Sequence, residues 1–243
     1  TVQQYDGSVW RTVSLAGWQP CRDIDGAIGP AAVATTGSAY AYQWTGSNWQ
    51  RSATGGATSG GIWVHASGIA LAPGPAGTIL RHDGAVWTSL STGTTAQLRT
   101  VWGASTTDVW AAGDGGSLLH YDGATWSPVS SGTTGTIRRL WGSGSSEVFA
   151  VVGDTSSGGA LLHYDGSQWR TVHTTTTPLL AVSGRTATDV FAVGTSGLIL
   201  RFDGTEWNVE VSGITETLLD VWASPEGEVL AVGARGLILR GRR

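Results

Sequence analysis

Aspartates and arginines that recur at corresponding places are the residues best suited to chemistry. Asp114, Asp154 and Arg235 each stand one or two positions after the glycine that ends an apolar run. Charged groups in such turns can bind a sugar hydroxyl or an ion. The stretch around Trp18 and Asp23 departs from the pattern of the rest of the chain and is a second candidate. The predicted ligand-binding residues are Arg99, Asp114, Arg138, Asp154, Arg235, Trp18 and Asp23.

Catalysis and metal binding have little support in the sequence. A glycosidase needs two carboxylates about 5–10 Å apart, for which Asp23, Asp25 and Asp220 are the candidates. A zinc site is not indicated, because neither an H-E-x-x-H nor a C-x-x-C motif is present. Cys21 has no identifiable His–Asn partners, so we expect a small buried residue there. We predict no catalytic residue, no metal and no cofactor.

A repeated six-residue segment organises the elements that must position these residues. The chain contains YDGSVW, WTGSNW, HDGAVW, YDGATW, YDGSQW and FDGTEW. The gaps between their final tryptophans are 39, 38, 39, 43 and 38 residues. A fixed period near 40 is typical of solenoids, propellers and other arrays, in which single units must stack to bury a core.

Each repeat is expected to contain four short strands. Asp122-Gly123, flanked by apolar residues, is a strong hairpin signal. No helical period occurs between such turns, and four strands per roughly 40 residues is the pattern of a propeller blade. In the third full repeat the expected strands are Leu98–Ser105, Val109–Gly113, Ser117–Tyr121 and Ala124–Ser130.

The sequence therefore predicts an all-β, six-bladed β-propeller with four antiparallel strands per blade. We expect one domain, 1–243, with blades at approximately 14–52, 53–92, 93–131, 132–174, 175–212 and 213–243 plus 1–13. The N-terminal strand would complete the blade begun by the C-terminal strands and so remove both edges. Val2–Tyr5 and Leu237–Arg240 both suit the third strand of that blade, and a seventh, partial blade is the alternative.

Composition excludes some partners. The net charge is −4 and no basic stripe is present, whereas nucleic-acid binding needs clustered positive charge. No apolar run reaches the roughly 18–20 residues needed to span a membrane. The chain has no methionine, even at position 1, which suggests a processed chain or an excised domain. We expect a monomer with a glycan or protein ligand, and no nucleic acid.

The turn-and-strand unit, such as Gly197–Trp207, resembles the Asp-box of sialidase-type propellers, although the serine of that box is absent. The longer pattern DVFAVGTSGLILRFDGTEW resembles photosystem II assembly-factor propellers and secreted tandem repeats of myxobacteria. By this resemblance the box aspartates are structural, and the chain is expected to be bacterial and secreted or on the cell surface. A sialidase would also need a Tyr–Glu pair and an arginine triad. Arg99, Arg138 and Arg139 suit the triad, but no glutamate accompanies the tyrosines.

Most repeated residues are better explained as structure than as sites. Tryptophans at matching positions are expected to pack between blades, since aromatic side chains dominate burial. His120 and His163 are expected at exposed or edge positions, and repeated acids are expected to brace a turn. Those acids are Asp108, Glu147, Asp189 and Glu228.

The predicted function is a non-catalytic binding or scaffolding propeller, recognising a glycan or a partner protein at the channel mouth or between blades. The alternatives are a sialidase-like, glycan-processing enzyme and an assembly factor that binds a protein client. The departures of the first repeat fit either function or drift.

Overall fold

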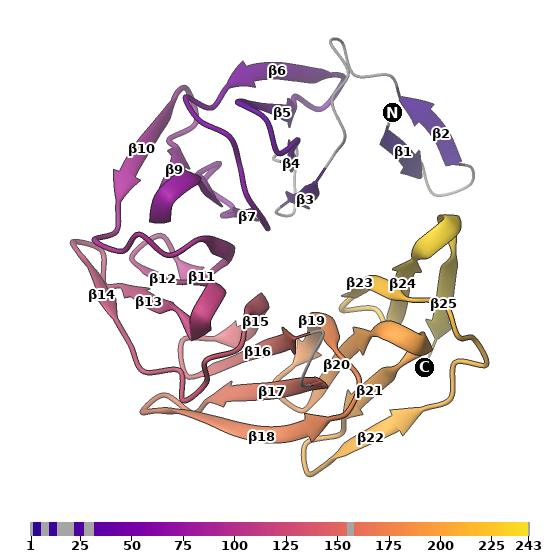
Figure 1. Ribbon diagram of the computed structural model, residues 1–243. Helices are drawn as coiled ribbons and strands as arrows, with labels where there is room; N and C mark the ends of the chain where they lie inside the picture. Colours follow the sequence, from indigo (N-terminus) through magenta and orange to yellow (C-terminus); the bar gives the residue numbers. More distant parts are fainter. Residues whose placement is uncertain (1, 6–9, 14–21, 27–31, 155–157, 243) are drawn as a thin grey trace. The chain divides into compact units, whose positions relative to one another are not determined.

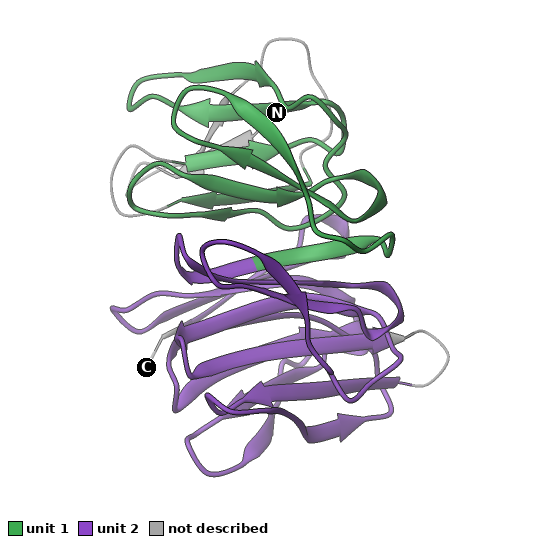
Figure 2. Cartoon of the chain, turned by 90° about the vertical axis from the view of Figure 1, so that its left-hand side faces the viewer, with its two compact units in different colours: residues 1–101 green, residues 102–243 purple. Residues whose placement is uncertain are grey.

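The structure, a computed structural model, describes residues 2–5, 10–13, 22–26, 32–154 and 158–242. The regular structure of these residues is β-strand, apart from four 3₁₀ turns of three residues each. The chain divides into two compact units, 1–101 and 102–243, and each is described by itself (Figure 2). The expectation of one domain stays a prediction.

The first unit contains a hairpin and two four-stranded antiparallel sheets (Figure 1). The hairpin strands are β1 (Val2–Tyr5) and β2 (Trp10–Val13). The first sheet contains β3 (Asp23–Gly26), β4 (Ala32–Thr35), β5 (Tyr40–Trp44) and β6 (Trp49–Ala53). The second contains β7 (Trp63–Val64), β8 (Ala70–Pro73), β9 (Thr78–His82) and β10 (Trp87–Ser91).

Three further four-stranded sheets follow along the chain, and then a final sheet of three strands. The strands of the third sheet are β11 (Leu98–Ser105), which starts in the first unit, β12 (Asp108–Gly113), β13 (Leu118–Tyr121) and β14 (Trp126–Pro128). Those of the fourth are β15 (Ile137–Gly144), β16 (Glu147–Asp154), β17 (Gly158–Tyr164) and β18 (Trp169–Thr175). Those of the fifth are β19 (Leu179–Thr186), β20 (Asp189–Gly194), β21 (Ile199–Phe202) and β22 (Trp207–Glu210). The last sheet contains β23 (Leu218–Ala223), β24 (Glu228–Gly233) and β25 (Ile238–Arg242).

The second strand of each complete sheet forms the core. In β20, for example, residues 190–194 are all buried, because neighbouring sheets cover both faces of the strand. Such strands read as continuous apolar runs rather than alternating ones. The described tertiary structure thus depends on packing between consecutive sheets, as expected for a repeat protein.

The longest repeat, the one with the gap of 43 residues, contains a long hairpin. Its ladder continues to Asp154 on β16 and resumes at Gly158 on β17. The extra residues of this repeat therefore lengthen a hairpin. The intervening residues, 155–157, lie outside the described part of the chain.

The predicted fold class is confirmed: the chain is all-β, with blades of antiparallel strands in the expected order. Five blades have four strands in one sheet and the sixth has its first three. Two segments were expected to compete for the third strand of that blade. The C-terminal one is its third strand, because β25 pairs with β24, and the N-terminal one, β1, pairs with β2. Completion of the last blade by β2 stays a prediction. None of the described helices has the length and apolar character of a membrane span.

Candidate functional site

The aspartates of the repeated turn are structural, as predicted. In four repeats one carboxylate oxygen, Oδ1, accepts hydrogen bonds from the backbone N–H groups two and three residues later, at 2.8–3.0 Å. In the repeat without an aspartate, Thr45 Oγ1 accepts from the N–H of Asn48 at 3.3 Å. The four aspartates are Asp83, Asp122, Asp165 and Asp203; Asp6 lies outside the described residues.

These hydrogen bonds favour the ionised carboxylates. The Thr205 hydroxyl, followed by the backbone N–H groups of Glu206 and Thr205, lowers the pKa of Asp203 from 3.8 to about 2. The Ser167 hydroxyl and the turn N–H groups likewise hold the pKa of Asp165 well below its ordinary value. Because these carboxylates are saturated by their own turns, they are poor candidates for acid–base chemistry near neutral pH.

A pH titration tests this role. The pKa of Asp203 is depressed in the folded chain, so its contribution to stability is complete above pH 3.8 and is lost as the pH falls toward 2. We expect Asp203→Asn to lower the unfolding midpoint at neutral pH and the difference from wild type to shrink below pH 3.8. Thr205→Ala, measured by NMR titration, should raise the pKa of Asp203. A difference that is unchanged down to pH 2 would show that the charge is not what stabilises the turn.

The tryptophans that follow these turns pack between sheets, as predicted. The Trp169 ring is 5.3 Å from Trp110 of the preceding sheet, and the Trp207 ring is 6.0 Å from Phe149. Trp87 donates its indole N–H to Ser52 Oγ at 3.1 Å. The side chain of Trp10 is not described.

The tryptophans of the first strands differ in how far they are packed against a neighbouring sheet. Trp102 and Trp141 lie against a glycine of the next sheet: a Cβ on Gly142 or Gly184 would come within 2.6 or 2.5 Å of the ring. Trp222, on the last sheet, is 53% exposed. The expectation that all first-strand tryptophans are core residues is therefore wrong for Trp222.

The repeated acids and histidines turn out to be partners. His120 Nε2 lies 2.7 Å from Asp108 Oδ1, and His163 Nε2 lies 2.8 Å from Glu147 Oε2. The next two blades use arginine at the same place, in the pairs Arg201–Asp189 and Arg240–Glu228. These acids thus join the second strand to the third, and the bracing of the turn that we expected from them stays a prediction. Among the described residues, no three His, Cys, Asp or Glu side chains lie close enough together to hold a metal ion.

The carboxylates considered for catalysis each have a protein partner. Asp23 Oδ2 accepts from the N–H of Ile62 at 2.8 Å, and Asp25 Oδ2 accepts from Val64 at 2.7 Å, which ties β3 to β7. Asp220 Oδ2 lies 2.7 Å from Arg139. That ion pair joins β15 and β23, the first strands of two sheets that are not consecutive.

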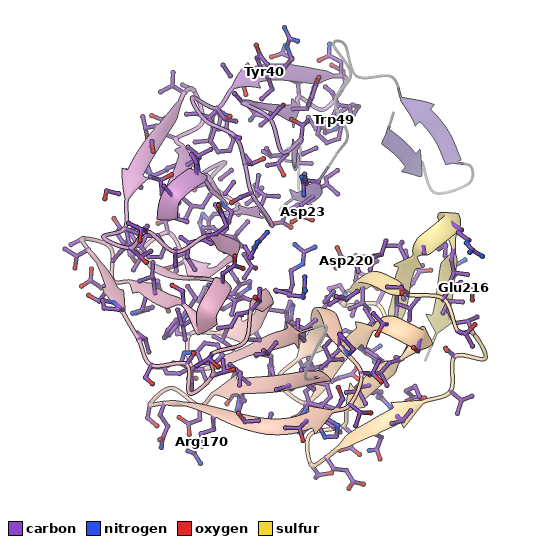
Figure 3. The ribbon with its side chains drawn as sticks, viewed as in Figure 1. Asp23, Tyr40, Trp49, Arg170, Glu216 and Asp220 are labelled. Carbon is purple, nitrogen blue, oxygen red and sulfur yellow. The ribbon has the colours of Figure 1, made fainter. Side chains whose placement is uncertain are left out.

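Of the other predicted site residues that the structure describes, Asp114 and Arg235 lie in turns between second and third strands, and Arg99 and Arg138 lie on first strands. Arg138 donates its Nε hydrogen to the carbonyl of Gly153 at 2.8 Å, so it anchors such a turn. Asp114 begins one turn and Arg235 is exposed in another, whereas Arg99 is exposed on β11. Trp18, Cys21 and the side chain of Asp154 lie outside what the structure describes. Figure 3 shows Asp220 on β23 and Arg170 on the outer strand β18.

Four of these turns share one backbone conformation. They are η1 (Pro75–Gly77), η2 (Asp114–Gly116), η3 (Thr195–Gly197) and η4 (Ala234–Gly236). The middle residue has φ of 50–66° and is followed by a glycine that also has positive φ. In three of the turns a side-chain hydroxyl donates a hydrogen bond to the carbonyl of the final glycine, as when Ser131 Oγ donates to Gly116 at 2.7 Å. The middle residues are Ala76, Gly115, Ser196 and Arg235.

Sequence reasoning missed this conformation because only one turn has glycine at the middle position. The signal that could have revealed it is a pair of glycines always three residues apart, at positions 74 and 77, 113 and 116, 194 and 197, and 233 and 236. Three non-glycine residues therefore hold a left-handed conformation that costs about 1–2 kcal/mol each. Strain of this kind is a reason to look for function in these turns.

Comparisons with known proteins identify the fold and no family. No protein-family model matches the sequence. One curated protein, immune protein Tsi7 of Pseudomonas aeruginosa, is 36% identical over 62 residues, which is 26% of this chain and 20% of that protein. The match thus spans about a fifth of that relative.

Solved structures are similar over nearly the whole chain. YCF48 bound to a D1 peptide has a TM-score of 0.74 and 17% identity, covering 98% of this chain and 83% of that one. Streptogramin B lyase has a TM-score of 0.72 and 9% identity, covering 93% and 83%. The Pan2 WD40 domain of Neurospora crassa has a TM-score of 0.70 and 13% identity, covering 92% and 76%. At these identities the likeness shows the fold alone, and that fold is the β-propeller.

Proposed function

We propose that this chain is a non-catalytic propeller that binds a segment of a partner protein through the turns between its second and third strands. The observation that carries the proposal is the set η2 to η4 of the second unit, in which one backbone conformation presents three different middle residues, Gly115, Ser196 and Arg235. A fixed scaffold with variable side chains on its turns is how many binding surfaces are built. Hydrogen bonds from the Ser131 and Ser212 hydroxyls fix two of these turns, so less conformational entropy is lost when a ligand binds.

Two further observations support binding over catalysis. The carboxylates of Asp23, Asp25 and Asp220 are held by backbone N–H groups or by Arg139. A carboxylate fixed in this way is not poised to exchange a proton. Among structures of the same fold, YCF48 is seen with a bound peptide, and we extend that mode of binding to this chain by proposal.

The residues proposed to contact the partner in the second unit are Asp114, Arg138 and Arg235. Asp114 and Arg235 lie in turns of the same conformation and carry opposite charges, which would set the orientation of a peptide. Arg138 donates its Nε hydrogen to the Gly153 carbonyl, which holds its guanidinium group beside the hairpin between β16 and β17. Secretion or display on a bacterial surface is part of the same proposal.

Selection of peptides from a random library against the whole chain tests this function. We expect enriched peptides whose affinity falls about tenfold or more on Asp114→Ala or Arg235→Ala, the size of a typical contact residue in an interface. Asp203→Asn, in a turn at the other end of its strand, is the matched control and should leave affinity unchanged. A glycan array and aryl glycoside substrates complete the test. Sugar binding without peptide binding, or turnover lost on Asp220→Asn, would replace the proposal with a lectin or an enzyme.

Arg235→Gly separates stability from binding. Glycine adopts the φ of 59° without strain, so we expect the free energy of unfolding to rise by up to about 1 kcal/mol. Peptide affinity should fall in the same variant because the guanidinium group is lost. Ser196→Gly, at the equivalent position of η3, is the control for the backbone effect. Chemical denaturation gives the first quantity and fluorescence anisotropy the second; a destabilised Arg235→Gly would contradict the assignment of strain.

A further inference from the structure

The second repeat has a histidine at a position where the other described repeats have a larger aromatic residue. In five repeats the last residue of the third strand packs against the tryptophan that begins the fourth, with ring centroids 5.0–5.6 Å apart. The five residues are Trp44, His82, Tyr121, Tyr164 and Phe202. Of these side chains, only the imidazole can gain a proton near neutral pH.

The imidazole of His82 is buried in its neutral form. The residue is 2% exposed, and its ring lies 5.0 Å from that of Trp87. Nδ1 accepts a hydrogen bond from the backbone N–H of Gly84 at 3.3 Å. A ring nitrogen can accept only while it carries no hydrogen, and both nitrogens carry one in the charged form. The hydrogen bond from Gly84 therefore requires the neutral imidazole.

The pair of His82 and Trp87 lies where the first and second sheets meet. Trp87 packs against a cluster of buried residues from both sheets, and its indole N–H donates to Ser52 on β6 at 3.1 Å. The cluster consists of Val33, Ala41, Ile62, Val64, Ala70 and Ala72. His82 is paired with Ala70 of β8 on one side and with Trp87 of β10 on the other. A charge on His82 would thus stand at the contact between the two sheets.

Burial opposes the protonation of this ring. It lowers the pKa of His82 below 6.5, while the Asp83 carboxylate and backbone hydrogen bonds with Gly68 and Ala85 act in the other direction. Asp83 Oδ1 is itself held by two N–H groups of its own turn, at 2.9 Å. Because its carboxylate is fixed there, Asp83 only partly offsets the effect of burial.

The strands around the ring supply little further charge. β4, β5, β7, β8 and β10 contain no Asp, Glu, Lys, Arg or His. Arg81 precedes His82 on β9 and points to the opposite face, because successive residues of a strand alternate. Arg51 of β6 lies over a tyrosine ring of β5 at 4.6 Å, and His65, after β7, lies 2.8 Å from a serine hydroxyl. The two carboxylates of β3 accept from backbone N–H groups at positions 62 and 64.

We infer that His82 is an acid-sensitive link between the first and second sheets. When Nδ1 takes a proton from solvent, it can no longer accept from Gly84, and a charge is placed in an apolar junction. The two sheets then hold together less well. The proposed function uses turns of the second unit, so this inference goes beyond that function and does not depend on it.

The pH range follows from the direction of the pKa shift. The pKa of His82 in the folded chain is lower than 6.5, so the unfolded chain binds the proton more readily. The stability that neutral His82 contributes is complete well above pH 6.5 and is lost as the pH falls below that value. The first unit should therefore become sensitive to acid where histidine titrates, before the carboxylates of the chain are protonated.

Hydrogen exchange of the whole chain tests the inference, with protection factors corrected for the intrinsic exchange rate at each pH. Between about pH 8 and about pH 5, we expect the amides of β8, β9 and β10 to lose protection and those of β20 to keep it. His82→Tyr introduces the residue found at positions 121 and 164 and keeps an aromatic pair with Trp87. This variant should remove the loss of protection. His65→Gln is the matched control and should behave as wild type.

An NMR titration of the His82 ring in the wild-type chain gives a second readout that needs no variant. We expect an apparent pKa below 6.5. A value at or above 6.5, an equal loss of protection in His82→Tyr, or an equal loss in β20 would overturn the inference. If His82→Tyr does not fold, the titration of the wild-type chain decides. Peptide binding through Asp114 and Arg235 is measured separately, so failure of one proposal is distinguishable from failure of the other.

Discussion

Trp110→Ala is expected to lower the free energy of unfolding by about 3–5 kcal/mol, the usual cost of deleting a large buried aromatic side chain. Trp110 is 2% exposed and contacts three rings: His120 of its own sheet, and Tyr164 and Trp169 of the next sheet. Removing the indole leaves a cavity that both sheets line, and neither strand can move inward without breaking its ladder. The cost therefore includes the lost burial and the cavity.

Trp222→Ala is the matched control for this substitution. Its side chain is 53% exposed, so the same chemical change should cost at most about 1 kcal/mol. Both variants are measured by urea denaturation, with tryptophan fluorescence and far-ultraviolet circular dichroism as independent probes of one transition. Equal losses for the two variants would contradict the view that junctions between consecutive sheets hold the second unit together.

The blade pattern could be predicted from the sequence because its signals are local. An Asp-Gly turn, two flanking apolar runs and a constant period are all read within about 40 residues. The hydrogen bonds of Asp122 and Asp203 follow from the same turn chemistry. The pairing of His120 with Asp108 is less local, because it needs the register between β12 and β13. The sequence singles out each of these two residues separately. The opposite charges of Arg201 and Asp189, at the same positions of a later blade, are the signal that the two positions form a pair.

Features that depend on an exception to the repeat could not be predicted in the same way. The packing of Trp141 requires a following sheet with glycine at position 184, and Trp222 is on the last sheet of the chain. The residues that the repeats share predict the fold, whereas the candidate binding residues stand at positions that differ from one repeat to the next.

Gly184→Ala is expected to destabilise the chain by about 1–3 kcal/mol through overpacking. The new Cβ would lie 2.5, 2.7 and 2.9 Å from three carbons of the Trp141 ring. The ring cannot easily give way, because its other contact is a stacked arrangement with Phe149 at 6.3 Å. Gly144→Ala, on the preceding first strand, is the control: nothing lies within 4 Å of its added Cβ, and its effect should be small.

The repeat itself shows how the clash can be relieved. At the next junction a serine, Ser183, stands in place of the tryptophan, and an alanine, Ala223, stands in place of the glycine. There Ser183 Oγ accepts a hydrogen bond from the N–H of Ala223 at 3.3 Å. Tryptophan with glycine and serine with alanine are thus two solutions to the same spacing between first strands.

A double-mutant cycle measures whether this exchange is transferable. We expect Trp141→Ser combined with Gly184→Ala to be more stable than the sum of the single effects by about 1 kcal/mol, within the range found for residues in contact. The gain arises because the serine removes the clash that the alanine creates and can accept from the N–H at position 184. Urea denaturation of wild type, the two single variants and the double variant gives the coupling energy. Additive effects would mean that the two junctions differ in backbone spacing, and that the serine–alanine pair is a consequence of that spacing.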